Sequence, residues 1–178
     1  RLQGLTGEVS GKLELGASTV PGEYIVPRLL GDFSAVHPSV EASVEIGDTA
    51  VISQRLLGAE CDLAFVGAPV EGRGLHIEKF LDDDLVLIVS ESHPFAQRQT
   101  INLEELEGEK LITREAGSGT MKSVYKMLNE AGFDGRKWQR APVFGSTQSI
   151  VSAVEARLGV AFVSSFAATT PLRAGTLA

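Results

Sequence analysis

The sequence predicts an α/β protein, in which strands and helices alternate along the chain. Apolar residues with strand spacing and with helix spacing follow one another from end to end. The run Leu63–Val66 is short and fully apolar, which is typical of a strand covered on both faces of a parallel sheet. Three times an apolar strand leads directly into a cluster of Gly, Ser and Thr that opens a helix. These junctions are LELGAST (13–19), LITREAGSGT (111–120) and PVFGST (142–147).

The first elements have clear boundaries. Alternation over Lys12–Gly16 predicts a strand, and the apolar spacing of Tyr24–Phe33 predicts an amphipathic helix. Pro27 falls in the first turns of that helix, where its missing N–H is tolerated. The helix ends at His37-Pro38, because a residue before proline disfavours the α region. A half-exposed strand follows over Val40–Ile46.

A second helix and further strands complete this cycle. Asp48 is the predicted N-cap of a helix over Thr49–Leu57, which Gly58 ends. The apolar strand Leu63–Val66 comes next. Further strands are predicted over Leu75–Phe80 and Leu85–Val89.

A second cycle begins after residue 96. Its longest helix has Met121, Val124, Tyr125, Leu128 and Ala131 on one face and stops at Gly132. The other elements predicted here are a short helix near Leu103–Leu106, strands over Leu111–Thr113, Ala141–Phe144 and Val160–Val163, and a helix over Thr147–Ala156. The tail, Ser164–Ala178, is weakly patterned.

Composition narrows the classes of function. The chain has 178 residues, of which 43% are apolar and 22% charged, as in ordinary globular proteins. The net charge of −7 and the scattered Lys and Arg argue against direct binding of this piece to a phosphate backbone. No apolar run approaches the roughly 20 residues of a membrane span.

The cysteine content and the N-terminus suggest a compartment and a context. The one cysteine, Cys61, excludes an internal disulfide and is expected to be a small buried side chain, which fits a reducing cytoplasm. The N-terminus lacks Met and a signal pattern, and we interpret it as the end of a fragment. A mature secreted protein would also have lost its signal.

The three junctions predict a binding site. The two α/β cycles meet near 89–92, with a return near 164–166, and this pattern predicts two lobes around a cleft. Ligands of open α/β sheets lie beyond the carboxyl ends of the strands, where all three junctions lie. Helix N-termini with small hydroxyls favour anions. None of the junctions carries a catalytic acid, base or metal ligand, so we expect binding without catalysis, no cofactor and no metal.

The same segments resemble the effector-binding domain of LysR-type transcriptional regulators. The family pattern begins with a Gly-x-leucine-rich strand and hydroxyl loop, here GKLELGAST, and a helix ending in an F-x-x-x-(H/Y)-P turn, here within VPRLLGDFSAVHPSV. It continues with D-L-A-F (62–65), H-P-F-A (93–96), R-E-x-G-S-G-T (114–120) and G-V-A-F-V (159–163). Six such pieces in the family's order extend over about Gly7 to Ser165.

The resemblance implies the fold of the type II periplasmic binding proteins, with two Rossmann-like lobes and a ligand cleft between them. Lobe I would comprise residues 1–90 with a return segment, 165–178, and lobe II residues 91–164. The resemblance also implies that the helix-turn-helix and the last part of lobe I lie outside this chain. By position, the inducer contacts it implies are Ser18, Thr19, Ser118, Gly119, Thr120, Thr147 and Gln148.

The partners implied are a small or anionic effector and further copies of the chain, as a homodimer or homotetramer. In the family's side-by-side dimer, the helix near Tyr24–Phe33 would meet the partner's second lobe. DNA would be contacted only through the absent N-terminal domain, with no membrane contact, in the cytoplasm. The function implied is an effector-sensing domain of a bacterial transcription regulator, not an enzyme.

Other interpretations of the same residues remain open. The scaffold also suits a solute-binding protein of a transporter or, less readily, an enzyme. Ser118 could be a plain N-cap, and Asp82–Asp84 could be imagined as a cation site, although such a triplet is more typical of a solvated turn. Arg114 could face the ligand as a counter-charge, or it could pair at the surface with Glu115 or Glu109.

Overall fold

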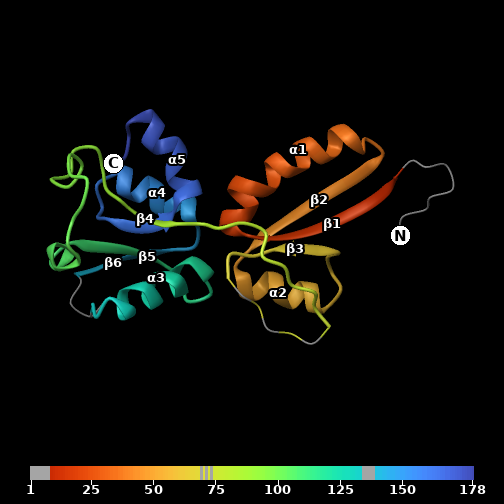
Figure 1. Ribbon diagram of the computed structural model, residues 1–178, viewed down its shortest axis with the longest axis horizontal. Coiled ribbons are helices and arrows are strands. Elements are labelled where there is room, and N and C mark those ends of the chain that lie inside the picture. Colours follow the sequence, from red (N-terminus) through yellow and green to blue (C-terminus); the bar gives the residue numbers. More distant parts are fainter. Residues whose placement is uncertain (1–8, 69, 71, 73, 134–138) are drawn as a thin grey trace. The chain divides into compact units, whose positions relative to one another are not determined.

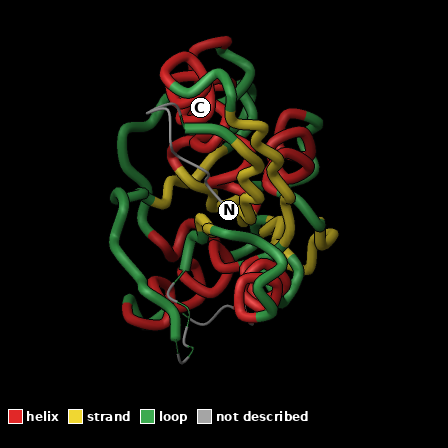
Figure 2. The backbone as a smooth tube through the Cα atoms, turned by 90° about the vertical axis from the view of Figure 1, so that its right-hand side faces the viewer, coloured by secondary structure: helices red, strands yellow, loops and turns green. Residues whose placement is uncertain are grey.

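The computed structural model describes residues 9–68, 70, 72, 74–133 and 139–178 (Figure 1). Its contacts divide the chain into two compact units, Arg1–Lys79 and Phe80–Ala178. Helices and strands alternate along the backbone in both units (Figure 2), as the sequence predicts. No helix of the described ranges is long and apolar enough to cross a membrane.

The first unit contains a parallel three-stranded sheet in the order β2-β1-β3. Its helices lie on opposite sides of this sheet, α1 on one side and α2 on the other (Figure 1). The elements are β1 (Gly11–Ser18), a π-helical turn η1 (Pro21–Ile25), α1 (Val26–Val36), β2 (Val40–Gly47), α2 (Thr49–Leu57) and β3 (Leu63–Phe65). These bounds confirm the predicted order of strands and helices up to residue 65.

The central strand β1 is buried over its second half, because both helices cover it. Leu15 and Ala17 form a small core with Val26 of α1. Gly16 faces the other helix: a Cβ there would lie 2.9 Å from Cγ2 of Ile52, so glycine permits the close approach of α2. Asp48 caps α2 as predicted, since its Oδ1 accepts a hydrogen bond of 2.8 Å from the Val51 backbone N–H.

Two predictions for this unit need correction. Strand β3 lies at the edge of the sheet, and Leu63 is 49% exposed, so the expectation of a strand covered on both faces is wrong. The strand predicted over Leu75–Phe80 is absent, because this segment pairs with no strand of the described chain and exposes its apolar side chains. Gly58 is the C-cap that ends α2, as predicted, and the residue after it, Ala59, is left-handed with φ of 54°.

The described residues of the second unit form four strands and three α-helices. Strands β5 and β6 are parallel, β4 and β7 are antiparallel, and a parallel bridge between Leu111 and Val160 joins the two pairs in the order β6-β5-β7-β4. The elements are β4 (Leu85–Ile88), a 3₁₀ turn η2 (Leu103–Leu106), β5 (Lys110–Arg114), α3 (Gly119–Glu130), β6 (Gln139–Phe144), α4 (Thr147–Glu155), β7 (Ala161–Ser164) and α5 (Ser165–Ala174).

The core of this unit lies where α3 covers the sheet. Its buried members are Val89, Leu106, Leu111, Met121, Val124, Leu128, Phe133 and Val160. Helix α3 ends before Gly132, whose φ of 74° is left-handed, as predicted from the glycine stop. Tyr125, predicted to face inward, is 48% exposed, because the buried stripe of α3 is narrower than the periodicity suggests.

Residues 80–90 and 165–178 belong to the second unit, although the sequence analysis assigns them to lobe I. Backbone pairing joins these two segments: the Val89 N–H donates to Ala178 O at 2.9 Å, and the Ala178 N–H donates to Val89 O at 3.0 Å. Helix α5, which the weak pattern of the tail did not reveal, packs on α4, β4 and β7. The lobe boundaries inferred from the family stay a prediction.

The carboxylate of Glu105 in η2 is held by hydrogen bonds that lower its pKa. Its carboxylate accepts two hydrogen bonds from Arg98, of 2.6 and 2.9 Å, and one of 2.9 Å from the Asn102 backbone N–H. These hydrogen bonds lower the pKa of Glu105 to about 2. The bonds from Arg98 have the largest effect, followed by the bond from Asn102. This interaction therefore stabilises the fold above the ordinary glutamate pKa, and the stabilisation is lost as the pH falls toward 2.

In the Arg98→Ala variant, we expect the pKa of Glu105 to rise toward its ordinary value while staying below it, because the Asn102 bond remains. The measurement is an NMR titration of the Glu105 side chain in both proteins. An identical midpoint in both would show that Arg98 does not hold this carboxylate in solution.

Candidate functional site

Three helices of the second unit begin directly after three neighbouring strands. Helix α3 follows β5, α4 follows β6 and α5 follows β7. Strands β5 and β6 are parallel, and β7 continues the segment that meets β5 in a parallel bridge. The carboxyl ends of the three strands therefore lie at one edge of the sheet, and three helix N-termini gather there. Such ends present free backbone N–H groups and partial positive charge.

A serine caps each of these helices. Ser118 Oγ accepts a hydrogen bond of 3.2 Å from the Met121 backbone N–H, and Ser146 Oγ accepts one of 3.1 Å from that of Ser149. Ser164 Oγ likewise accepts a bond of 3.2 Å from the backbone N–H two residues on. The sequence analysis singles out Ser118 but not the other two caps, although both occupy the position before a helix.

Helix α5 already has a carboxylate of its own chain at its N-terminus. Asp83 Oδ1 accepts hydrogen bonds from the hydroxyls of Ser164, at 2.8 Å, and Ser165, at 3.4 Å. Burial raises the pKa of Asp83, while these hydrogen bonds act in the opposite direction. Asp83 thus occupies the N-terminus of α5. The N-termini of α3 and α4 are the two where an external anion could bind.

The structure brings five of the residues implied by the resemblance to these two helix starts. Ser118 is the cap of α3, followed by Gly119 and Thr120 in the first turn; Ser118 is 3% exposed. Thr147 and Gln148 begin α4, where Thr147 is 2% exposed and Gln148 is exposed. Hydroxyls and backbone N–H groups therefore supply the polar character of this edge.

Arg114, the last residue of β5, links the two helix starts. Its guanidinium makes two hydrogen bonds to the Glu115 carboxylate, of 2.8 and 2.7 Å. It also donates to Thr147 Oγ1 at 2.9 Å and to the Gly145 carbonyl at 3.2 Å. The structure shows the pairing with Glu115 that the sequence analysis considered, but the Arg114 side chain is only 3% exposed and not at the surface.

The two remaining predicted contacts lie in the first unit. Ser18 ends β1 and is 5% exposed, and its Oγ accepts a hydrogen bond of 3.0 Å from the Gly67 backbone N–H. Gly67 comes just after β3, so this bond joins the carboxyl ends of two neighbouring strands. Thr19 follows at the start of the helical segment that leads into η1. These two residues form the polar junction of that unit.

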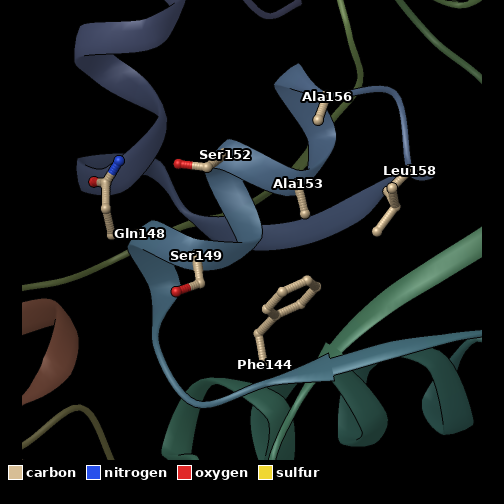
Figure 3. Close-up of a pocket in the computed structure, with 7 residues that line it drawn as sticks. All are labelled: Phe144, Gln148, Ser149, Ser152, Ala153, Ala156 and Leu158. Atoms are coloured by element: carbon tan, nitrogen blue, oxygen red, sulfur yellow. The ribbon is translucent and has the colours of Figure 1, made fainter.

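A shallow hollow of about 420 Å³ lies beside the start of α4 (Figure 3). Its lining residues are Phe144, Gln148, Ser149, Ser152, Ala153, Ala156 and Leu158. The Phe144 ring faces Ser149 and Ala153, while the Gln148 amide points away from that ring (Figure 3). Gln148 therefore contributes to the outer face of α4, and no charged side chain lines the hollow.

Metal-binding side chains and the cysteine thiol can be located among the described residues. Within these ranges, no cluster of three His, Cys, Asp or Glu side chains is placed to hold a metal ion. Cys61 is buried as predicted, and burial raises the pKa of its thiol, which makes it a poor nucleophile at neutral pH. The polar edge described above presents hydroxyls and backbone N–H groups, which suit a hydrogen-bond acceptor.

Comparison with known sequences gives consistent relatives. The family model of the LysR substrate binding domain matches residues 6–178. A probable RuBisCO transcriptional regulator of Cyanophora paradoxa is 35% identical over 99% of this chain and 55% of the relative. The HTH-type transcriptional activator CmpR of Synechocystis sp. is 37% identical over 90% of this chain and 51% of the relative. The chain thus spans about half the length of the curated relatives it matches.

Solved structures with a similar fold are also regulatory or effector-binding domains. The regulatory domain of Synechocystis PCC6803 CcmR in complex with 2-PG has a TM-score of 0.84 and 30% identity, over 94% of this chain and 79% of that one. The effector binding domain of QuiR in complex with shikimate has a TM-score of 0.80 and 22% identity, over 94% of this chain and 78% of that one. These neighbours confirm the predicted type II periplasmic-binding-protein-like fold. The motifs, the fold and the family match over residues 6–178 together show that the chain belongs to the LysR substrate-binding domain family.

Proposed function

We propose that this chain is the effector-sensing domain of a transcription regulator and that it binds a small anion at the starts of α3 and α4. The observation that carries this proposal is the convergence of two helix N-termini with buried hydroxyls at one edge of the β5–β6 pair. The complex of the CcmR regulatory domain with 2-PG, at 30% identity, supports a ligand-binding role for the domain.

The proposed contacts in the second unit are Ser118, Gly119, Thr120, Thr147 and Gln148. Ser18 and Thr19 of the first unit are proposed as ligand contacts through the polar junction of that unit. No formal cation is needed: the chain carries a net charge of −7, and Arg114 is already compensated by Glu115. Hydrogen bonds to a charged ligand contribute roughly 1.5–3 kcal/mol each, so a few of them reach micromolar affinity, roughly 8 kcal/mol.

The wider biology belongs to this proposal as well. Ligand binding would favour one conformation of the domain and so alter DNA binding by a domain outside this chain. We propose that the chain acts without catalysis, in the cytoplasm, as part of a homodimer or homotetramer. The relatives that support this are transcriptional regulators about twice as long as the chain.

Calorimetric titration of the chain with 2-PG, inorganic phosphate and sulfate tests the binding site. We expect at least one of these anions to bind the wild type, and the Ser118→Ala/Thr120→Ala double variant to bind it at least about tenfold more weakly. The matched control is Ser123→Ala, which removes an exposed hydroxyl from the same helix and is expected to leave the affinity unchanged.

Two results would count against the proposal. Unaltered affinity in the Ser118/Thr120 variant would exclude the start of α3 as a contact. A wild type that binds none of the three anions would exclude an oxyanion site of this kind. Ser18→Ala tests the first unit separately: a loss of affinity supports its contact with the ligand, and no loss removes Ser18 from the site.

A further inference from the structure

A buried arginine, Arg114, lies at the end of β5 beside the proposed anion site. Arginine is seldom fully buried unless it is paired, because a charge removed from water needs compensating partners. Arg114 has such partners, since Glu115 takes two of its N–H groups and the Gly145 carbonyl takes another. The hydrogen bond to Thr147 goes beyond this charge compensation and determines how that hydroxyl can act.

The direction of the Arg114–Thr147 bond is fixed by chemistry. A guanidinium has five N–H donors and no acceptor, so Thr147 Oγ1 must accept at 2.9 Å. The one hydroxyl hydrogen of Thr147 is then directed elsewhere. Thr147 is 2% exposed, and no residue in the described ranges accepts that hydrogen. A buried donor without an acceptor is costly, which points to a ligand atom that accepts it.

We propose that Arg114 is a positioning residue that makes Thr147 a dedicated hydrogen-bond donor, so that the start of α4 selects an acceptor oxygen over a donor group. This inference rests on the proposed function and identifies what determines specificity at that site. A deprotonated phosphate, sulfate or carboxylate oxygen satisfies the hydroxyl, whereas an ammonium or amide N–H in the same place would meet a second donor.

The contacts of Arg114 distinguish this role from simple charge attraction. Glu115 balances the positive charge at 2.7 and 2.8 Å, so little net charge remains to attract a ligand. The bond to the Gly145 carbonyl fixes the loop that leads into α4 and thereby the position of Thr147. A lysine could supply the charge but, with one nitrogen, could not hold Glu115, Gly145 and Thr147 together.

A double-mutant cycle of binding tests the inference, with 2-PG and inorganic phosphate as probes. Arg114→Lys keeps the charge and Thr147→Val keeps the shape without the hydroxyl. We expect each to weaken binding about tenfold, and the double variant to be no weaker than either alone, because the two residues act through one hydroxyl. Thr147→Ser, which keeps the hydroxyl, is expected to stay within about threefold of the wild type.

Additive losses, about a hundredfold in the double variant, would show that Arg114 acts independently of Thr147 and would overturn the inference. Full affinity in Arg114→Lys would do the same, because charge alone would then suffice. If the wild type binds neither probe, the proposed function fails and NMR of the ligand-free protein still decides: Thr147→Val must shift the Arg114 guanidinium resonances. Unchanged resonances would mean that the hydrogen bond behind the inference does not form in solution.

Discussion

Replacing Gly159 with alanine is expected to lower the free energy of unfolding of the second unit by about 3 kcal/mol, the upper end of the usual cost of overpacking. A Cβ at this position would lie 2.1 Å from the backbone oxygen of Lys110, far inside any normal contact. That oxygen accepts the Val160 N–H at 2.9 Å, and the Ile112 N–H donates to the Val160 carbonyl at 2.9 Å. Relief of the clash would therefore break the backbone pairing that joins β5 to β7.

The measurement is urea denaturation, and the chain provides a matched control. Gly31 lies inside α1, and a Cβ there would meet nothing within 4 Å. Gly31→Ala is expected to stabilise the protein by about 0.5–1 kcal/mol, because alanine is the better helix former. If Gly159→Ala unfolds within about 1 kcal/mol of the wild type, the two strands do not approach each other as closely as described.

Gly159 shows how a pattern in the sequence relates to a physical requirement. In the sequence, this glycine is only the first residue of the family motif G-V-A-F-V. In the structure, the same residue is the place where two strands come too close for any side chain, and the alignment of helix starts depends on that approach. A single sequence shows the glycine, but it does not show which strand lies opposite it.

Local signals account for the elements that the sequence predicts correctly. Asp48 caps α2, and the glycine at 132 ends α3, because capping and left-handed turns depend on residues that are neighbours in sequence. Helix α5 was missed for the opposite reason. Its sequence is rich in Ser and Thr and includes Pro171, and its stability comes from tertiary burial of Ala167 and Ala168, which no local pattern shows.

The strand errors have the same origin. Leu63–Val66 is apolar enough for an interior strand, yet β3 lies at the edge of the described sheet. Leu75–Phe80 alternates like a strand but has no partner in the part of the chain that the structure describes, and Phe80 is 59% exposed. Alternation indicates that a segment can pair; pairing itself depends on a neighbouring strand with free hydrogen-bonding groups.

In the candidate site too, local features could be predicted from the sequence and tertiary contacts could not. Ser118 and Thr147 could be predicted, because a hydroxyl after an apolar strand marks a helix start. The burial of Arg114 could not, since it depends on β5 and β6 lying side by side and on the Gly145 carbonyl turning toward β5. From the sequence, Arg114 could therefore be described only as a charge that faces a ligand or pairs with Glu115 or Glu109.

Removing the carboxylate of Glu115 is expected to be the other large effect. Glu115→Ala removes the carboxylate that pairs with the guanidinium of Arg114, whose side chain is 3% exposed. Breaking a fully buried pair in this way costs about 3–5 kcal/mol. The Glu115 side chain is 33% exposed, so water screens part of the interaction, and we expect a loss of about 2–3 kcal/mol in the free energy of unfolding.

Two further variants separate this effect from the general loss of a surface carboxylate. Lys126 and Glu130 form an exposed pair at 3.8 Å, so Glu130→Ala is expected to cost only about 0.3–0.5 kcal/mol. The Arg114→Met/Glu115→Ala double variant also removes the guanidinium charge. It should recover part of the unfolding free energy lost in Glu115→Ala, because breaking a buried ion pair costs more than replacing the whole pair. Equal losses for Glu115→Ala and Glu130→Ala in denaturant titrations would mean that water, and not Glu115, compensates the charge of Arg114. In that case Arg114 would be free to leave Thr147, and the hydroxyl at the start of α4 would lose its fixed direction.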